Sequence, residues 1–492
     1  MLVSLPAALV FGACFDGKFA FPTCSDGLKN GYESDVDCGG EPGLGCARCA
    51  EGQACEYGYD CETNVCDAGV CATGATSIEL AAGERHTCVN LDGKVRCWGI
   101  GPTGALGYGN TTTIGDDEVP ADAGYVDIGG DASQISAGGD HTCALLDDGS
   151  VVCWGNGPCG ELGYGNTTTI GDDELPSDAG PVPLGSSGAR AVELAAGTFH
   201  TCVLLDTGGV RCWGYGGEGA LGYGNTLSGL GIADGSNIGD TETLDDLGGV
   251  DVDIGGTVEH IVAGRIHTCA LYDVDPTTGG SVRCWGQNAE GQLGHGLIDQ
   301  PARTQVGDDE SPSAIDPVLT GVAQIVAGGA HTCGLLVDGT VRCWGYGPEG
   351  ALGYGSTETI GDGEGVPTDA VPIGGTVIEL AAGRYHTCAR LEAGEIRCWG
   401  RGLFGVLGYG NSDNIGDDET LSELAMPSVQ IEPVERLALG GEHTCALLSP
   451  VDSETGTIKC WGYGSTGALG YGSTATLGDD ETPLEIDGVP YR

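Results

Sequence analysis

One motif recurs seven times between residue 77 and the end of the chain, and this repetition constrains the fold more than any other feature. Its consensus runs A-G-x-x-H-T-C, then C-W-G, then L-G-Y-G and finally I-G-D-D-E. The histidine stands at His86, His141, His200, His267, His331, His386 and His443. The C-W-G motif contains every tryptophan of the chain: Trp98, Trp154, Trp213, Trp285, Trp344, Trp399 and Trp461. A period of about 60 residues with short β signals and no helical periodicity is typical of a propeller or a β-solenoid.

The two cysteines of each repeat flank a predicted β-hairpin. In HTCVNLDGKVRCWG, Cys88 and Cys97 lie equally far from the Asp92-Gly93 turn, so they face each other across the strands. Loops of other lengths keep this register, and opposed residues of an antiparallel pair lie within disulfide range. We therefore predict seven cross-strand disulfides: Cys88–Cys97, Cys143–Cys153, Cys202–Cys212, Cys269–Cys284, Cys333–Cys343, Cys388–Cys398 and Cys445–Cys460.

The repeat resembles that of the regulator of chromosome condensation family, whose pattern is G-x-x-H-T-x-A-L, W-G and G-x-L-G-x-G. The fourth repeat, HTCALYDVDPTTGGSVRCWGQNAEGQLGHG, is the most similar to it. The resemblance implies an all-β fold, a seven-bladed β-propeller over residues 77–492. The eukaryotic member exchanges guanine nucleotide on a small GTPase and sits on chromatin, which does not suit this chain. Bacterial relatives include a secreted propeller that inhibits β-lactamase by binding it face-on, which implies protein binding.

Charge and cysteine content restrict the location and the partners. The 492 residues include 19 Lys and Arg against 71 Asp and Glu, a formal net charge of −52. This charge repels phosphate backbones and anionic lipids, so we expect no nucleic-acid partner. The 93 glycines without a G-X-Y period favour a turn-rich all-β chain. The 24 cysteines indicate an oxidising compartment.

The start of the chain predicts export. Residues 2–13, LVSLPAALVFGA, are too short to span a bilayer but match the apolar region of a signal peptide. Gly12-Ala13 before Cys14 resembles the lipobox of bacterial lipoproteins, in which that cysteine is lipidated, although Phe11 departs from the pattern. An ordinary secretory signal cleaved nearby is the alternative. We therefore predict a signal segment over 1–13 and either a secreted protein or an outer-membrane, cell-surface lipoprotein anchored at Cys14.

A cysteine-rich module over residues 24–72 follows. Eight cysteines occupy this stretch: Cys24, Cys38, Cys46, Cys49, Cys55, Cys61, Cys66 and Cys71. Because large apolar residues are few, we expect four disulfides of open connectivity to stabilise it. Half of a zinc site at Cys46-Ala-Arg-Cys49 is the alternative, but the stretch has no histidine. The module resembles short Cys-rich stalks of exported myxobacterial proteins. Outside it, Cys159 has no counterpart in other repeats, and we predict a free thiol there if Cys14 is lipidated.

The repeated polar residues point to structure rather than catalysis. A residue that recurs in every blade has a structural role that all blades share. We therefore interpret the histidines, with the threonines that follow, as buried hydrogen-bonding groups. The chain contains no nucleophile elbow, P-loop or HExxH motif. We therefore expect no enzymatic activity and no cofactor other than calcium. A propeller lyase or hydrolase is the alternative, but it would need a unique cluster of acids or histidines on one face, and the sequence does not indicate one around the non-repeated His260 and His295.

The acidic motif is the candidate metal site. Its first Asp and last Glu recur in all seven repeats, and flexible loops of hard oxygen ligands could hold calcium. The candidate ligands are Asp116, Glu118, Asp172, Glu174, Asp308 and Glu310. The favoured alternative is a solvated loop whose carboxylates cap backbone amides.

The candidate binding site is the position where the repeats disagree. The residue directly before each H-T-C is Arg85, Asp140, Phe199, Ile266, Ala330, Tyr385 or Glu442. Equivalent loops should gather these residues in a ring on one face. All but Ala330 are predicted partner contacts. We predict a monomeric, non-enzymatic propeller that binds a protein or glycan at the cell envelope. A calcium-dependent structural surface protein is the alternative.

Overall fold

The computed structural model describes residues 66–67, 70–71, 78–185, 188, 190–224, 236–296, 305–424, 428–449 and 456–492. The chain divides into two compact units, Met1–Ala75 and Thr76–Arg492. In the first unit, β1 (Cys66–Asp67) pairs antiparallel with β2 (Val70–Cys71). The predicted signal segment, the lipidation site Cys14 and the disulfides of the cysteine-rich module lie outside the described residues.

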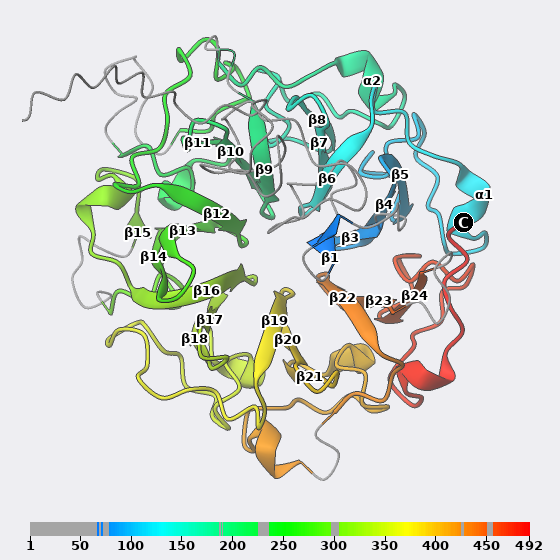
Figure 1. Ribbon diagram of the computed structural model, residues 1–492. Helices are drawn as coiled ribbons and strands as arrows, with labels where there is room; N and C mark the ends of the chain where they lie inside the picture. The colour runs from blue at the N-terminus through cyan, green and yellow to red at the C-terminus, as the bar shows by residue number, and fades with distance from the viewer. Residues whose placement is uncertain are drawn as a thin grey trace, which may run out of the picture. The chain divides into compact units, whose positions relative to one another are not determined.

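The second unit is a ring of seven blades around a central axis (Figure 1). Blade one contains β3 (Ile78–Ala82), β4 (His86–Leu91) and β5 (Lys94–Gly99). Blade two contains β6 (Ala132–Ala137), β7 (His141–Leu146) and β8 (Val151–Gly155), and blade three contains β9 (Ala191–Ala196), β10 (His200–Leu205) and β11 (Val210–Gly214). Blade four contains β12 (Val258–Ala263), β13 (His267–Asp275) and β14 (Gly279–Gln287). Blade five contains β16 (Leu319–Ala327), β17 (His331–Leu336) and β18 (Val341–Gly345); blade six β19 (Val377–Ala382), β20 (His386–Leu391) and β21 (Ile396–Gly400); blade seven β22 (Val434–Leu439), β23 (His443–Leu448) and β24 (Thr457–Gly462). The predicted all-β, seven-bladed architecture is confirmed.

The outer edge of each blade is a short fourth segment. In six blades it is a single bridge, as between Gly99 and Ile114, and in blade four it is β15 (Gln305–Val306). Short helices lie on the connectors: α1 (Pro120–Ala123), α2 (Pro176–Ala179), and the 3-10 turns η2 (Gly217–Gly219), η4 (Pro312–Ala314), η5 (Pro348–Gly350), η6 (Leu403–Gly405), η7 (Leu421–Glu423) and η8 (Pro483–Glu485). Among the described residues, no helix is both long enough and apolar enough to cross a bilayer.

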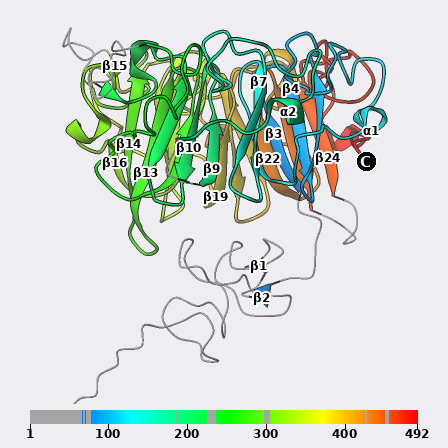
Figure 2. The same cartoon turned by 90° about the horizontal axis from the view of Figure 1, so that it is seen from above.

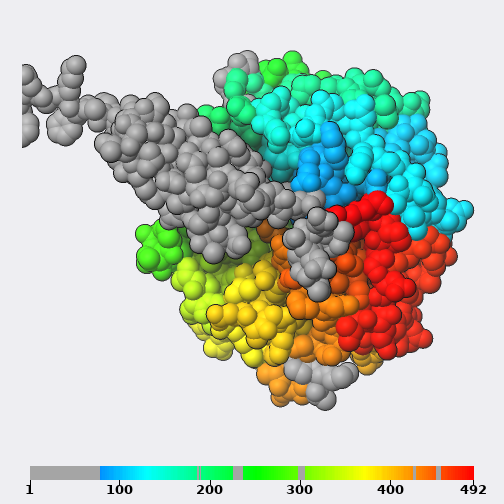
Figure 3. Space-filling model, turned by 45° about the vertical axis from the view of Figure 1, so that its right-hand side comes forward, coloured from blue at the N-terminus to red at the C-terminus, as the bar shows by residue number. Residues whose placement is uncertain are grey.

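The ring closes between the last and the first blade, which lie side by side in Figure 3 in red and blue. The end of the chain joins blade one, where the Ala121 amide donates a hydrogen bond to the Pro490 carbonyl at 3.0 Å. The Arg96 guanidinium donates to the Tyr491 carbonyl. The carboxyl end of the chain therefore holds the first blade in place.

The seven predicted disulfides are all present. Cys88 pairs with Cys97 in register, and the other six pairs are also cross-strand partners in their hairpins. Their sequence separations of 9, 10 or 15 residues follow from the loop lengths. Within the described residues Cys159 forms no disulfide, and the prediction of a free thiol there, which depends on lipidation of Cys14, stays a prediction.

Each tryptophan joins its own blade to the preceding one. All seven indoles are completely buried. The Trp98 indole N–H donates to the Ala468 carbonyl of blade seven at 2.8 Å, and the Thr87 hydroxyl donates to the same oxygen at 3.0 Å. Trp154 and Thr142 share the Ala105 carbonyl in the same way. At five of the seven boundaries one carbonyl receives both donors from the next blade. Among the described residues, only the Thr268 hydroxyl donates in blade four, to the Ala220 carbonyl, and only the Trp399 indole N–H donates in blade six, to the Ala351 carbonyl.

The histidines complete a closed hydrogen-bond ring. Each His Nε2 lies 2.7–3.1 Å from the hydroxyl of the threonine in the next blade: His86–Thr142, His141–Thr201, His200–Thr268, His267–Thr332, His331–Thr387, His386–Thr444 and His443–Thr87. Because the Thr142 hydroxyl already donates to a carbonyl, it accepts from His86, which therefore carries its proton on Nε2. The interpretation of these residues as buried hydrogen-bonding groups is confirmed.

We expect Thr142→Val to lower the free energy of unfolding by about 1–3 kcal/mol, because it leaves the buried His86 N–H without an acceptor while preserving side-chain shape. Thr111→Val, the same change at an exposed position, should stay within about 0.5 kcal/mol. Urea unfolding of both variants measures the difference. Equal effects would show that the ring adds nothing to stability.

We expect stability to fall steeply below about pH 6. Burial lowers the pKa of His86 to about 3 and that of His141 to about 4, whereas a histidine in an unfolded chain has a pKa of about 6.5. Between these values the unfolded state binds more protons, so the stability present above pH 6.5 is lost as the pH falls towards 4. Urea midpoints from pH 8 to pH 4 measure this loss.

His260 provides the control for the pH series. Its hydrogen bond to Glu193 raises the pKa of His260, opposite to the shift of the ring histidines. His260→Gln should leave the acid-induced loss of stability in place. If the loss disappears in this variant, the ring histidines are not its cause.

Candidate partner-binding face

The loop before each histidine is held tightly at the end of an inner strand. A Cβ added to Gly83 would lie 2.4 Å from His86 Cε1 and 2.5 Å from the Gly138 carbonyl oxygen, so only glycine fits. The repeated A-G therefore forces a close turn, and the next residues lie on the face seen at the upper edge of Figure 2. The β-hairpins project from the opposite edge.

The predicted binding residues form an inner ring on this face. Arg85, Asp140, Phe199, Ile266, Ala330, Tyr385 and Glu442 each lie in the turn before the middle strand, and all are half-buried. The structure thus brings the predicted residues to equivalent positions around one axis. Partner binding by these residues stays a prediction.

A second, outer ring surrounds the first. It consists of the residue after each C-W-G: Ile100, Asn156, Tyr215, Gln287, Tyr346, Arg401 and Tyr463. The backbone amide of each donates to the carbonyl of the inner-ring residue in its own blade, at 2.8–3.1 Å. Three of these residues are tyrosines and the other four all differ, whereas the inner ring has seven different residues. These residues were not predicted from the sequence, although the variable position directly after each constant C-W-G motif could have indicated them.

Glu84 reaches across the axis at the centre of the face. Its carboxylate accepts from the Thr198 hydroxyl of blade three at 3.4 Å and from the Arg384 guanidinium of blade six at 3.4 Å. Blades one, three and six are not neighbours in the ring. Glu84 therefore links loops on different sides of the central opening, a role that the sequence did not reveal.

Tyr385 lies at the centre of an aromatic and cationic cluster. The guanidinium carbons of Arg384 and Arg401 lie 5.1 and 5.4 Å from its ring centroid. Tyr346 of blade five approaches with ring centroids 6.1 Å apart. Cation–π contacts of this kind are worth about 0.5–2 kcal/mol and hold the ring in a defined orientation.

The same sector extends into blade seven. Phe404 packs on Tyr463 with centroids 4.5 Å apart, and the neighbouring Leu403 is 38% exposed. Phe404 adopts φ 65°, a left-handed conformation that is unusual for an aromatic residue. The loop therefore holds an apolar side chain at the surface in a strained conformation.

A smaller cluster lies on blades three and four. Phe199 meets Tyr215 edge-on with centroids 6.4 Å apart, and the Arg265 guanidinium lies 5.7 Å from the Phe199 centroid. Arg85 and Asp140 form an ion pair at 2.7 Å between blades one and two. The face thus combines two aromatic–arginine clusters with charged residues between them.

Comparison with known proteins identifies the family. A family model described as the RCC1-like domain matches residues 44–414. The chain belongs to the RCC1-like domain family. Human HERC2, an E3 ubiquitin-protein ligase, is 29% identical over 375 residues, which cover 75% of this chain but 7% of HERC2. The ultraviolet-B receptor UVR8 of Arabidopsis thaliana is 27% identical over 399 residues, covering 79% of this chain and 78% of UVR8.

Solved structures share the fold of this RCC1-like propeller. Yeast RCC1 (Prp20), solved with Kap60, has a TM-score of 0.57 and 21% identity, covering 84% of this chain and 85% of that chain. Human WBSCR16 also has a TM-score of 0.57, at 19% identity, covering 77% and 88%. The blades described here continue beyond the family match to the end of the chain.

The acidic motif gathers carboxylates in five blades of the RCC1-like propeller. One oxygen from each member lies within 4.8 Å of the others in Asp116–Asp117–Glu118, Asp172–Asp173–Glu174, Asp308–Asp309–Glu310, Asp417–Asp418–Glu419 and Asp479–Asp480–Glu481. The predicted Asp and Glu pairs do come together, joined by a middle Asp that the prediction omitted. Burial and the crowded neighbouring carboxylates raise the pKa of Glu310 to about 8. Calcium binding here stays a prediction.

Cys159 and Glu161 of blade two have no counterparts in the other repeats, and we assign no catalytic role to them. Cys159 is half-buried, and its backbone amide donates to the Glu161 carboxylate at 2.8 Å. Burial raises the pKa of the Cys159 thiol and raises that of Glu161 to about 7. A raised thiol pKa lowers the thiolate fraction and with it the reactivity.

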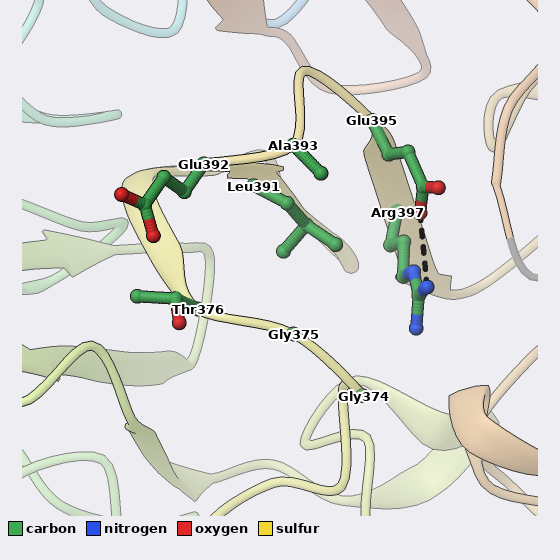
Figure 4. Close-up of a pocket in the computed structure, with 8 residues that line it drawn as sticks. All are labelled: Gly374, Gly375, Thr376, Leu391, Glu392, Ala393, Glu395 and Arg397. Carbon is green, nitrogen blue, oxygen red and sulfur yellow. Dashed lines mark hydrogen bonds and ion pairs between the residues drawn. The ribbon is translucent and has the colours of Figure 1, made fainter.

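A pocket of about 440 Å³ lies on the opposite face, at the hairpin of blade six (Figure 4). Glu392, Glu395 and Arg397 supply its charged groups. Arg397 is bound to Glu395 at 3.0 Å and donates to the Ile373 carbonyl. This arginine repeats in other blades, where Arg96 and Arg283 also hold backbone carbonyls. It therefore joins segments of the fold, and we assign no chemistry to the pocket.

We expect Glu310→Gln to raise the melting temperature at pH 9 more than at pH 5. The raised pKa of Glu310 means that ionisation opposes folding, so wild-type stability falls as the pH rises from about 4.5 to about 8, and glutamine removes this loss. Calorimetric melts at both pH values measure it, and repeating them with calcium or a chelator tests the calcium prediction.

The control is Glu364→Gln in blade five, where Gly363 replaces the middle acid and Glu364 is exposed. This variant should shift the melting temperature equally at the two pH values. A lower melting temperature of Glu310→Gln at pH 9 would contradict the crowding of carboxylates at this site.

Proposed function

We propose that this chain is an exported, non-enzymatic RCC1-like propeller that binds a protein partner through its inner and outer rings. The Tyr385 cluster is the observation that carries the proposal. Tyrosine, arginine and phenylalanine are enriched at the energetic centres of protein interfaces, and here they gather at variable positions of a repeated scaffold. Side chains that served only the fold would repeat from blade to blade, as the buried tryptophans do.

Relatives support a protein partner. One solved structure is of Kap60 bound to yeast RCC1, and another yeast study describes the binding of Prp20p to Gsp1p and histones. We take from these the general use of the fold rather than the partners. The ligase activity in the name of HERC2 is not transferred, because this chain spans 7% of that protein.

The cellular context of the proposal rests on the chemistry of the chain. Seven disulfides form and persist in an oxidising compartment, and the apolar start of the chain matches an export signal. We propose a secreted or cell-surface protein whose partner lies at or near the envelope. A calcium-dependent structural role is the alternative, which the melts with chelator address.

We expect Tyr385→Ala to weaken partner binding by about 2 kcal/mol or more, because it removes the ring on which two guanidiniums stack. Proteins captured from the native envelope by the wild-type chain are identified, and their affinity for each variant is measured by interferometry. Tyr125→Ala, which removes a 51% exposed tyrosine on the hairpin side, is the control and should bind as wild type.

The melting temperatures of both variants should stay close to that of the wild type, since neither residue belongs to the core. Equal affinity of Tyr385→Ala and wild type would contradict the proposed face. Loss of binding in Tyr125→Ala instead would place the site on the hairpin side. A captured polysaccharide in place of a protein would favour a glycan partner.

A further inference from the structure

Arg265 differs from the other arginines of the partner-binding face. Arg85 is paired with Asp140 at 2.7 Å, Arg384 with Glu84 at 3.4 Å, and Arg401 with Glu349 and Glu442 at 3.7 and 3.9 Å. Arg265 is exposed, and within the described residues its side chain forms no ion pair. An exposed arginine without a carboxylate is unexpected in a chain with 71 acidic residues.

An aromatic side chain lies beside Arg265. Its guanidinium lies over Phe199 at 5.7 Å from the ring centroid, and Phe199 is supported edge-on by Tyr215. Ile266 is the adjacent inner-ring residue. A guanidinium that stacks on a ring keeps the N–H groups in its own plane available, and their fork matches a carboxylate. The site therefore offers two parallel donors beside an apolar surface.

The net charge of −52 restricts what can reach this site. A polyanion such as a polyuronate or a nucleic acid is repelled by the whole surface. A single carboxylate on an otherwise neutral or basic protein meets far less repulsion, because charges beyond about 8 Å are screened at physiological salt. Arg265 then supplies the local attraction, and Phe199 and Ile266 supply apolar contacts for a neighbouring side chain.

We propose that Arg265 receives an Asp or Glu carboxylate from a loop of the protein partner, with an apolar residue next to that carboxylate packing on Phe199 and Ile266. This inference rests on the proposed function and adds the chemistry of the partner. It assigns to blades three and four a subsite separate from the Tyr385 cluster.

A phage-displayed library of short cyclic peptides tests the proposal without knowledge of the natural partner. The full chain is immobilised at 0.15 M salt, and bound loops are sequenced. We expect enriched loops to carry Asp or Glu beside a large apolar residue. Synthetic versions of these loops should bind Arg265→Met at least about tenfold more weakly than wild type, because a charge-assisted bidentate pair is lost.

Two further variants sharpen the test. Arg265→Lys keeps the charge but not the planar fork, so it should bind more weakly than wild type and more tightly than Arg265→Met. Arg190→Met removes an exposed arginine from the hairpin side, where Arg190 donates to the Asp147 carbonyl. It changes the net charge as Arg265→Met does and should bind the loops as wild type does.

Four results would overturn the proposal: enriched loops without acidic residues, no enrichment at all, acidic loops that bind Arg265→Met as tightly as wild type, or soluble polygalacturonate that binds wild type but not Arg265→Met. The last result would assign the subsite to an acidic glycan. If Tyr385→Ala weakens binding of the captured partner while Arg265→Met does not, the inference fails and the proposed function stands. If neither variant weakens it, both fail.

Discussion

The hydrogen bond from each histidine to the threonine of the next blade is the interaction on which the rest of the ring depends. Five blades are separate three-stranded sheets, so most blade boundaries have no strand pairing, and they are joined by side chains and by single backbone hydrogen bonds between loops. The bond from His443 to Thr87 joins residues 356 positions apart at 2.8 Å, within the range of the other six. The ring therefore closes with the same contact that builds it. Burial lowers the pKa of all seven histidines and so keeps them neutral at physiological pH.

The residues that hold the blades together are different from the residues that form the partner-binding face. Histidine, threonine and tryptophan bind neighbouring blades below the face, while the inner and outer rings are held by a backbone hydrogen bond that any side chain permits. Tyr385 and Glu442 can thus occupy equivalent positions without a change in the scaffold. A family built in this way can change partners through loop residues alone, which explains why membership does not reveal what the chain binds.

The arginines of the partner-binding face and their ion pairs distinguish this face from the rest of the acidic chain. The chain has a formal net charge of −52, yet the loops around the central opening carry four arginines, three of which are neutralised by nearby carboxylates. Glu84 and Arg384 stabilise the centre, and the Tyr385 cluster orders one side. Arg265 keeps a free charge on the other side. A partner for such a face combines low overall negative charge with a local acidic group.

The sequence by itself determined the number of repeats, the register of the hairpins and all seven disulfides, because these follow from how often the motif occurs and from the spacing within one repeat. It also located the inner ring, since equivalent loops of a closed ring share a face. Only the tertiary structure decided which side chains meet across the axis: Glu84 lies 114 positions from Thr198 and 300 from Arg384. Such contacts follow from ring closure and not from local periodicity. For the same reason, the sequence could not distinguish the paired Arg384 from the unpaired Arg265, although both stand two residues before a histidine.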